Sequence, residues 1–108
     1  MLIVTTPIIE GVKIKEYKGP VFNQVVAGFD VLMSLSAGWR NLVGGRSESH
    51  ESQVEMARNE AISGIIERAR NMGANAIIGL TVDYEMISGT QSSNAMLMTK
   101  VFGTAVVV

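Results

Sequence analysis

The stretch Gly73-Ala74-Asn75-Ala76-Ile77-Ile78-Gly79 decides the fold of this chain. Apolar residues recur at helical spacing in the long segment before it, and an alternating, strand-like pattern begins at Ala76. Glycine commonly follows a helix C-terminus because it adopts the left-handed conformation without steric cost, and Gly73 has that position. The stretch therefore predicts a helix that turns almost directly into a strand, which fixes how the helix lies on the sheet.

The preceding segment predicts a long amphipathic helix from about Ser52 to Met72. Ser52 and Glu55 have the spacing of a capping box, which satisfies free backbone N–H groups at a helix start. Arg68 and Arg70 fall in the last turn, where the helix dipole favours positive charge. The expected buried stripe comprises Val54, Ala57, Ala61, Ile65, Ala69 and Met72, widened by Ile62 and Ile66. Its alanines allow a close approach to a sheet.

Two strands are predicted after the helix, over residues 76–87 and 95–108, joined by a polar hairpin loop at 88–94. In the first strand, Ala76, Ile78, Leu80, Val82, Tyr84 and Met86 would share one face, with Thr81, Asp83 and Glu85 on the other. The last strand is apolar on both faces, with Leu97, Val101 and Val107 on one and Met96, Met98, Phe102 and Val106 on the other. The predicted helices are too few to cover both faces, so a neighbouring subunit is expected on the second.

The N-terminal part predicts further strands. Residues 2–6 are apolar and β-branched, as expected for a short strand that Pro7 ends. Residues 10–18 alternate as a half-exposed strand or an extended arm. Gly19-Pro20 is a turn signal before a strand over 21–28, in which Val21 and Val25 share one face and Phe22 and Val26 the other.

A short helix is predicted between this strand and the long helix. Asp30 has N-cap character, and Gly44-Gly45 terminates the helical pattern. The apolar positions of this helix are Leu32, Leu35, Trp39 and Leu42. The element order predicts one α+β domain over residues 1–108, with the long helix packed on a mainly antiparallel sheet.

Composition excludes several classes of partner. Nine basic and ten acidic residues are scattered along the chain, which gives no basic stripe for nucleic acid and no polybasic segment for a membrane. There is no cysteine, no basic region of a signal peptide and no apolar run of the ~18 residues that a membrane helix needs. The cytoplasm is the expected location.

The chain is unusually apolar for its size. Hydrophobic residues make up 47% of it and charged residues 18%, against about 25% charged residues in an average protein. A chain this short buries only about two-thirds of its surface by folding alone. Large exposed apolar patches usually mark interfaces, so we expect a subunit of a homo-oligomer.

Four motifs together resemble the YbjQ-like family of small bacterial and archaeal proteins of uncharacterised function. They are Gly44-Gly45-Arg46-Ser47, Ala57-Arg58, the stretch Gly73–Gly79 and the terminal Gly103-Thr104-Ala105-Val106. The motifs are in family order over nearly the whole chain. The resemblance implies a dodecin-like β-α-β-β subunit that assembles as a ring, a pentamer. Some descriptions call the family heavy-metal-binding, and the resemblance supplies no catalytic residues.

Gly44, Gly45, Arg46 and Ser47 form a candidate anion site. Two glycines let backbone N–H groups turn toward an anion, Arg46 adds a fork of donors, and the long helix begins nearby. A phosphate or carboxylate is the expected ligand. The alternative is that the glycines only end a helix and that Arg46 makes a structural ion pair.

A divalent metal ion is the cofactor that the family description suggests, and the chain offers few ligands for it. His50 is the single imidazole, with Glu48 and Glu51 as neighbouring oxygen ligands. One copy cannot build a closed tetrahedral site of nitrogen and sulfur ligands, whereas a ring could bring His50 of several copies together. The alternative is an ordinary solvated histidine near a helix N-terminus.

An enzymatic function has weak support in the sequence. Asp83 and Glu85 lie on one strand face and could act as a carboxylate pair in a small hydrolase. A polar, solvent-facing side of a strand is the favoured account of them. We therefore expect a non-enzymatic, ring-forming protein that binds a small ligand or ion at subunit interfaces, with a metal-binding protein or a small hydrolase as alternatives.

Overall fold

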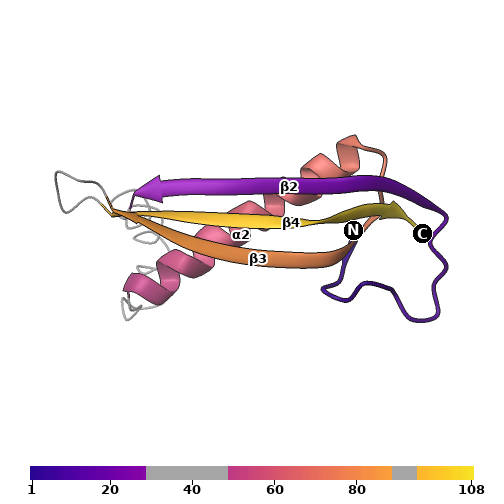
Figure 1. Cartoon of the computed structure of the whole chain (residues 1–108), viewed down its shortest axis with the longest axis horizontal. Coiled ribbons are helices and arrows are strands. Elements are labelled where there is room, and N and C mark those ends of the chain that lie inside the picture. The colour runs from indigo at the N-terminus through magenta and orange to yellow at the C-terminus, as the bar shows by residue number, and fades with distance from the viewer. Residues whose placement is uncertain (29–48, 89–94) are drawn as a thin grey trace, which may run out of the picture.

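The computed structural model describes residues 1–28, 49–88 and 95–108 (Figure 1). The elements in chain order are β1 (Leu2–Ile3), β2 (Glu16–Gly28), α2 (Ser49–Asn71), β3 (Ala76–Ser88) and β4 (Ala95–Val107). The strands form a four-stranded sheet in the order β1-β3-β4-β2. The short helix predicted from Asp30 and the loop predicted at 88–94 fall on residues 29–48 and 89–94, outside the described residues.

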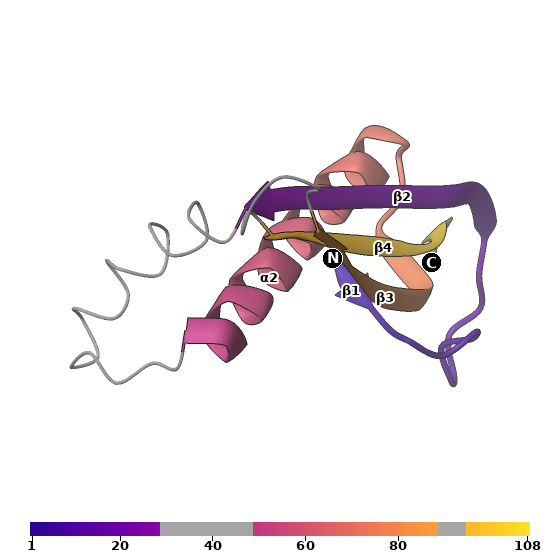
Figure 2. The same ribbon diagram turned by 60° about the vertical axis from the view of Figure 1, so that its left-hand side comes forward.

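The sheet is mixed but mainly antiparallel. β4 lies between β2 and β3 and pairs antiparallel with both, whereas β1 pairs parallel with β3 at the edge. α2 packs on one face of this sheet, and Figure 2 shows it behind the strands, with β1 beside β3. The elements β2, α2, β3 and β4 therefore follow the expected β-α-β-β order, and the α+β class predicted from the sequence is confirmed.

The apolar stripe of α2 explains its position. The buried apolar residues of α2 are Ala57, Ala61, Ile65 and Ala69, all within the predicted stripe. Val54 and Met72, at the two ends of the stripe, are partly buried. The helix begins at Ser49 rather than Ser52, so Ser52 lies inside the helix and the predicted capping box is wrong.

The end of α2 has the geometry that the glycine signal predicts. Gly73 has a φ of 87°, and its N–H donates to the Arg70 carbonyl at 2.9 Å. The N–H of Ala74 donates to the Ala69 carbonyl at 3.0 Å. These two bonds form a Schellman motif, which satisfies carbonyls that a helix end leaves free. Two residues later the chain enters β3 at Ala76.

Gly64 of α2 lies directly over Asn23 of β2. The Asn23 side chain donates from Nδ2 to the Ala61 carbonyl at 2.9 Å. A Cβ on Gly64 would lie 2.9 Å from Asn23 Cγ and nearer still to Nδ2. A side chain at position 64 would therefore push the helix away from β2.

A bulge in β3 corrects the predicted faces of that strand. Gly79 has a φ of 63°, and the pairing register with β4 shifts between Ile78 and Thr81, opposite Gly103. The extra residue reverses the alternation of side chains, as bulges do. Ile77, Leu80 and Val82 pack in the core under α2, whereas Ala76 and Ile78 pack on the opposite face. The prediction that Ala76, Ile78 and Leu80 share a face is therefore wrong.

Two N-terminal predictions also need correction. The turn expected at Gly19-Pro20 is a bulge inside β2, where Gly19 has a φ of 117°. Proline, which has no backbone N–H to donate, is tolerated there because β2 lies at an edge of the described sheet and is paired on one side only. The first strand is shorter than predicted, since residues beyond Ile3 keep only separate hydrogen bonds to β3, such as Val4 N–H to the Ile77 carbonyl at 2.9 Å.

We predict that Gly64→Ala destabilises the protein, although alanine is the better helix former by about 1 kcal/mol. The new methyl group would collide with Asn23, and overpacking of this kind costs about 1–3 kcal/mol. Urea denaturation measures the change. Ser63→Ala, on the exposed side of α2, is the control. Adding Asn23→Ala should recover part of the loss, and a more stable Gly64→Ala variant would contradict the prediction.

Candidate functional site

The sheet has an open face, defined as the face opposite α2. The pairing register places Phe22 directly opposite Phe102, and Val26 opposite Met98, on this face. Its exposed large apolar side chains are Tyr17, Phe22, Val26, Met96 and Phe102. Phe22 and Phe102 are 60% and 40% exposed, far more than aromatic residues in a protein core. These side chains give the open face an exposed apolar surface.

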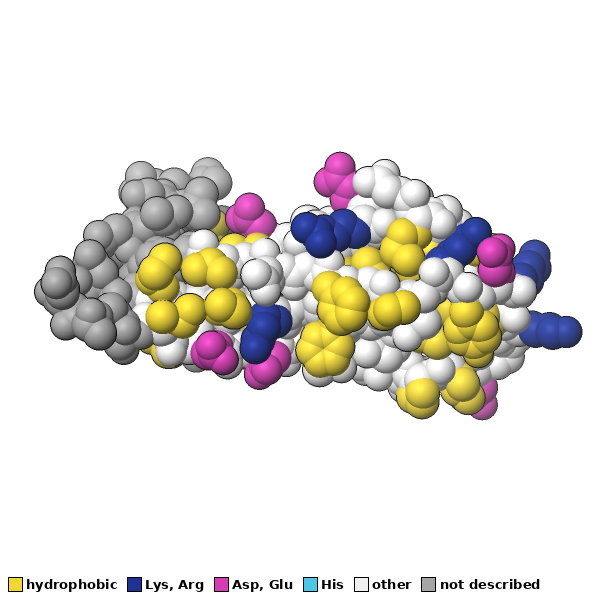
Figure 3. Space-filling model, turned by 45° about the horizontal axis from the view of Figure 1, so that its top comes forward, with side chains coloured by type: hydrophobic (Ala, Val, Ile, Leu, Met, Phe, Trp, Pro, Cys, Tyr) yellow, Lys and Arg dark blue, Asp and Glu magenta, His cyan; other side chains and the backbone are white. Residues whose placement is uncertain are grey.

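A charged row crosses the open face between its two apolar groups (Figure 3). Lys100 of β4 lies 3.7 Å from an Asp83 oxygen and 3.8 Å from a Glu85 oxygen of β3. The two carboxylates therefore share a face, as the sequence predicts. Both are more than half exposed, and Lys100 balances part of their charge. Their arrangement is that of an ordinary surface ion-pair network.

A second feature lies along the outer edge of β2. We name it the edge groove, and it is lined by Pro20, Val21, Phe22, Arg68, Asn71 and Met72. Its volume is about 290 Å³. A further hollow of about 290 Å³ continues from it past Phe22 and Arg68 to Lys100 and Phe102. Through this second hollow the edge groove is continuous with the open face.

Arg68 connects α2 to the rim of the edge groove. Its Nη1 donates to the Phe22 carbonyl at 3.1 Å, which holds the guanidinium beside β2. Among the residues that the structure describes, no carboxylate pairs with it. From the sequence alone, Arg68 was expected only to interact with the helix dipole. Gly64 could have indicated that Arg68 also lies beside a strand, because a glycine inside a helix often marks the side that packs closely, and Arg68 follows it by one turn.

The residues predicted to bind ligands are not tested by this geometry. Gly44, Gly45, Arg46, Ser47 and Glu48 lie outside the described residues. His50 and Glu51 lie in the first turn of α2, where the structure describes the backbone but not the side chains. Within residues 1–28, 49–88 and 95–108, no group of three His, Cys, Asp or Glu side chains could hold a metal ion.

Sequence comparison places the chain in a family. A family model described as "Putative heavy-metal-binding", YbjQ_1, matches residues 1–108. The chain belongs to this YbjQ family. The resemblance noted in the sequence is thereby confirmed over the full length.

Relatives of the chain in bacteria carry names without an activity. A "UPF0145 protein" of Clostridium kluyveri is 47% identical over 108 residues, covering 100% of this chain and 99% of the relative. A "UPF0145 protein" of Listeria ivanovii is 44% identical, covering 100% of this chain and 96% of the relative. These names denote uncharacterised proteins, and neither name specifies an enzymatic activity.

A solved structure has the same fold. It is a protein of unknown function from Pediococcus pentosaceus, assigned to the DUF74 family. The TM-score is 0.66 at 20% identity, with 100% of this chain and 97% of the other covered. At this identity the likeness supports the fold alone. In addition, no helix in the described parts of this YbjQ-family chain is long and apolar enough to cross a membrane.

We predict that Lys100→Met lowers the free energy of unfolding by no more than about 1 kcal/mol, because exposed ion pairs contribute little in water. The variant leaves Asp83 and Glu85 without their counter-charge, so the loss should be larger at low salt than at high salt. Urea denaturation at two sodium chloride concentrations measures it, with Arg70→Met, at an exposed position of α2 outside the edge groove, as the control. A loss that is large and independent of salt would contradict this account of the charged row.

Proposed function

We propose that this YbjQ-family protein is a non-enzymatic, ring-forming homo-oligomer that binds a small ligand or ion where its copies meet. The observation that supports it is the open face. Phe22 and Phe102 form an exposed cross-strand aromatic pair there, and Val26 and Met96 add exposed apolar surface beyond the charged row. Burying apolar surface stabilises an assembly by about 25 cal/mol per Å².

The composition of the chain favours the same reading. α2 occupies one face of the sheet, and Met96 and Phe102 of β4, which point the other way, are exposed in the described subunit, so contact with another copy would bury them. Exposed apolar surface of this extent is typical of subunits rather than of monomers. Five copies are the number that the resemblance to the family implies.

The proposal that the protein is non-enzymatic also has local support. Asp83 and Glu85 are the acidic pair that a hydrolase would need. Both are exposed, and both form an ion pair with Lys100. In the alternative hydrolase reading, Asp83→Asn or Glu85→Gln would abolish turnover on a panel of generic ester and phosphate substrates.

A ligand bound between copies fits the chemistry of the chain. Heavy metals that prefer soft ligands bind thiolate or imidazole, and this chain has no Cys and one His. A ring multiplies the single His50, and Glu48 and Glu51 could add oxygen ligands. Gly44, Gly45, Arg46 and Ser47 are the proposed residues for an anion, since glycine backbone N–H groups and a guanidinium suit phosphate or carboxylate.

We predict that Phe102→Lys weakens the assembly strongly, because it places a charge in the apolar part of the proposed interface. Size-exclusion chromatography with light scattering should show a shift toward monomer. Ser63→Lys adds the same charge on the exposed side of α2 and should leave the assembly unchanged. Equal behaviour of the two variants would count against the open face as an interface.

Two variants test the ligand. His50→Ala should remove Zn²⁺ or Cu²⁺ that binds to the wild-type ring, measured by elemental analysis after dialysis. Arg46→Ala should weaken binding of inorganic phosphate, measured by calorimetry, while the assembly is kept. Unchanged metal content would exclude His50 as a ligand, and unchanged phosphate binding would exclude the Gly44–Ser47 site.

A further inference from the structure

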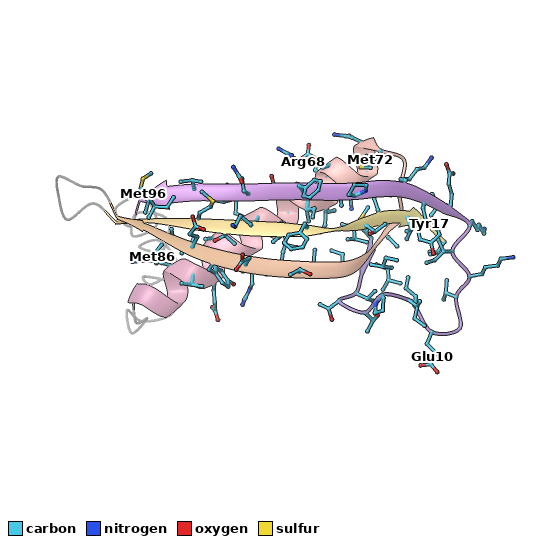
Figure 4. The ribbon with its side chains drawn as sticks, in the orientation of Figure 1. Glu10, Tyr17, Arg68, Met72, Met86 and Met96 are labelled. Carbon is cyan, nitrogen blue, oxygen red and sulfur yellow. The ribbon has the colours of Figure 1, made fainter. Side chains whose placement is uncertain are left out.

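We propose that adjacent copies in the ring are joined by an arm of one copy, residues 7–15, seated in the edge groove of the next; this rests on the proposed oligomer. The arm and the groove lie at opposite edges of the sheet. Figure 4 shows Glu10 beyond the β3 side, whereas Arg68 and Met72 lie on the β2 side. One subunit therefore carries both halves of the contact, on surfaces that cannot meet within it.

The tip of the arm is apolar and carries one negative charge, Glu10, and the exposed Lys13 and Lys15 follow it. Ile8 is 64% exposed and Val12 is 42% exposed, and Glu10 lies between them in sequence. A turn shapes the tip, since the Val12 N–H donates to the Ile9 carbonyl at 3.1 Å and Gly11 has a φ of 77°. The exposed side chains of Ile8 and Val12 are not used for packing inside their own subunit. They are therefore available to contact another copy.

Both ends of the arm are tied to the sheet. The Thr6 carbonyl accepts a bond from the Gly79 N–H at 2.8 Å, and the Lys15 N–H donates to the Val107 carbonyl at 2.8 Å. Ile9 and Ile14 pack against the cluster of Ala76, Ile78 and Val106. The arm is thus held in place before it binds, which reduces the entropy that binding would cost.

The edge groove offers the matching chemistry. Phe22 and Met72 supply an apolar lining for Ile8 and Val12. Arg68 supplies a positive charge at the rim, and its hydrogen bond to the Phe22 carbonyl leaves other guanidinium donors for a carboxylate. Glu10, at the tip of the arm of the adjacent copy, is the carboxylate that would pair with Arg68. An apolar contact with one opposite-charge pair at the rim is a common arrangement in protein interfaces.

The placement of the two halves also fits a ring. A contact between two different surfaces is heterologous, and it repeats from copy to copy until the rotation closes it. A two-fold contact would instead join a surface to itself. The arm and the groove are different surfaces at opposite edges, so this contact generates a ring or a longer chain rather than an isolated dimer.

A charge exchange tests the pairing. Arg68→Glu and Glu10→Arg should each raise the concentration at which the ring dissociates by about tenfold or more, because each places like charges together at every interface. The double variant that carries both Arg68→Glu and Glu10→Arg in one chain should assemble again, since every interface then joins opposite charges whatever the number of copies. Arg70→Glu and Glu60→Arg make the same changes at exposed positions of α2 outside the groove, and they should leave the ring intact.

Cross-linking tests the geometry. The chain has no cysteine, so Ile8→Cys with Met72→Cys introduces the only two thiols. Oxidation of the assembled double variant should give a ladder of linked copies on a denaturing gel, while each single variant should give none. Linked dimers from a single variant would show a two-fold contact and overturn the proposal.

The outcomes separate the two proposals. If both charge reversals leave the ring intact and the double cysteine variant does not cross-link, the arm–groove contact is wrong. The oligomer still stands in that case, provided that the wild type is a ring and Phe102→Lys dissociates it. A monomeric wild type would overturn both proposals together.

Discussion

Several of the residues through which α2 packs against the sheet are alanine or glycine, which have the smallest side chains. Ala57, Ala61 and Ala69 bring the helix backbone close to the strands, and Gly64 leaves room for the Asn23 side chain beneath it. The Asn23 amide then donates to the Ala61 carbonyl, so close packing and a hydrogen bond depend on the same glycine. This contact fixes which face of the sheet belongs to the core, and it turns Arg68 toward the edge of β2.

The rest of the surface follows from that choice of face. Side chains of β2 and β4 that point away from α2 remain exposed, and they include the aromatic pair of Phe22 and Phe102. The charged row through Lys100 divides this apolar surface, which keeps the register of any covering partner specific, because like charges brought together oppose a misaligned contact. In our account the open face, the arm and the edge groove are separate regions of the subunit that all contact other copies in the assembly.

Elements governed by local chemistry were predictable from the sequence. The stripe of α2, its end at Gly73 and the faces of β4 each depend on residue type at a fixed spacing. The bulges at Gly79 and Gly19 were not predictable in this way, because they depend on how two strands align. A regular alternation through residues 76–86 therefore gave wrong faces for Ala76 and Ile78. The edge groove was missed for a related reason, since its lining comes from β2 and α2, which are distant in sequence. Of the predicted ligand residues, Gly44–Glu48 fall outside the described chain and His50 and Glu51 have no described side chains, so the anion and metal sites stay predictions.

The central claim is that the folded subunit is incomplete without other copies of itself. Native mass spectrometry of untagged protein, purified without added metal, tests it most directly. The account predicts a closed species whose mass is a multiple of the 11.6 kDa subunit, five copies in the proposed ring, with any bound ion or small molecule appearing as a fixed extra mass. A stable monomer at micromolar concentration would contradict it, because the open face and the arm would then remain in water with no partner.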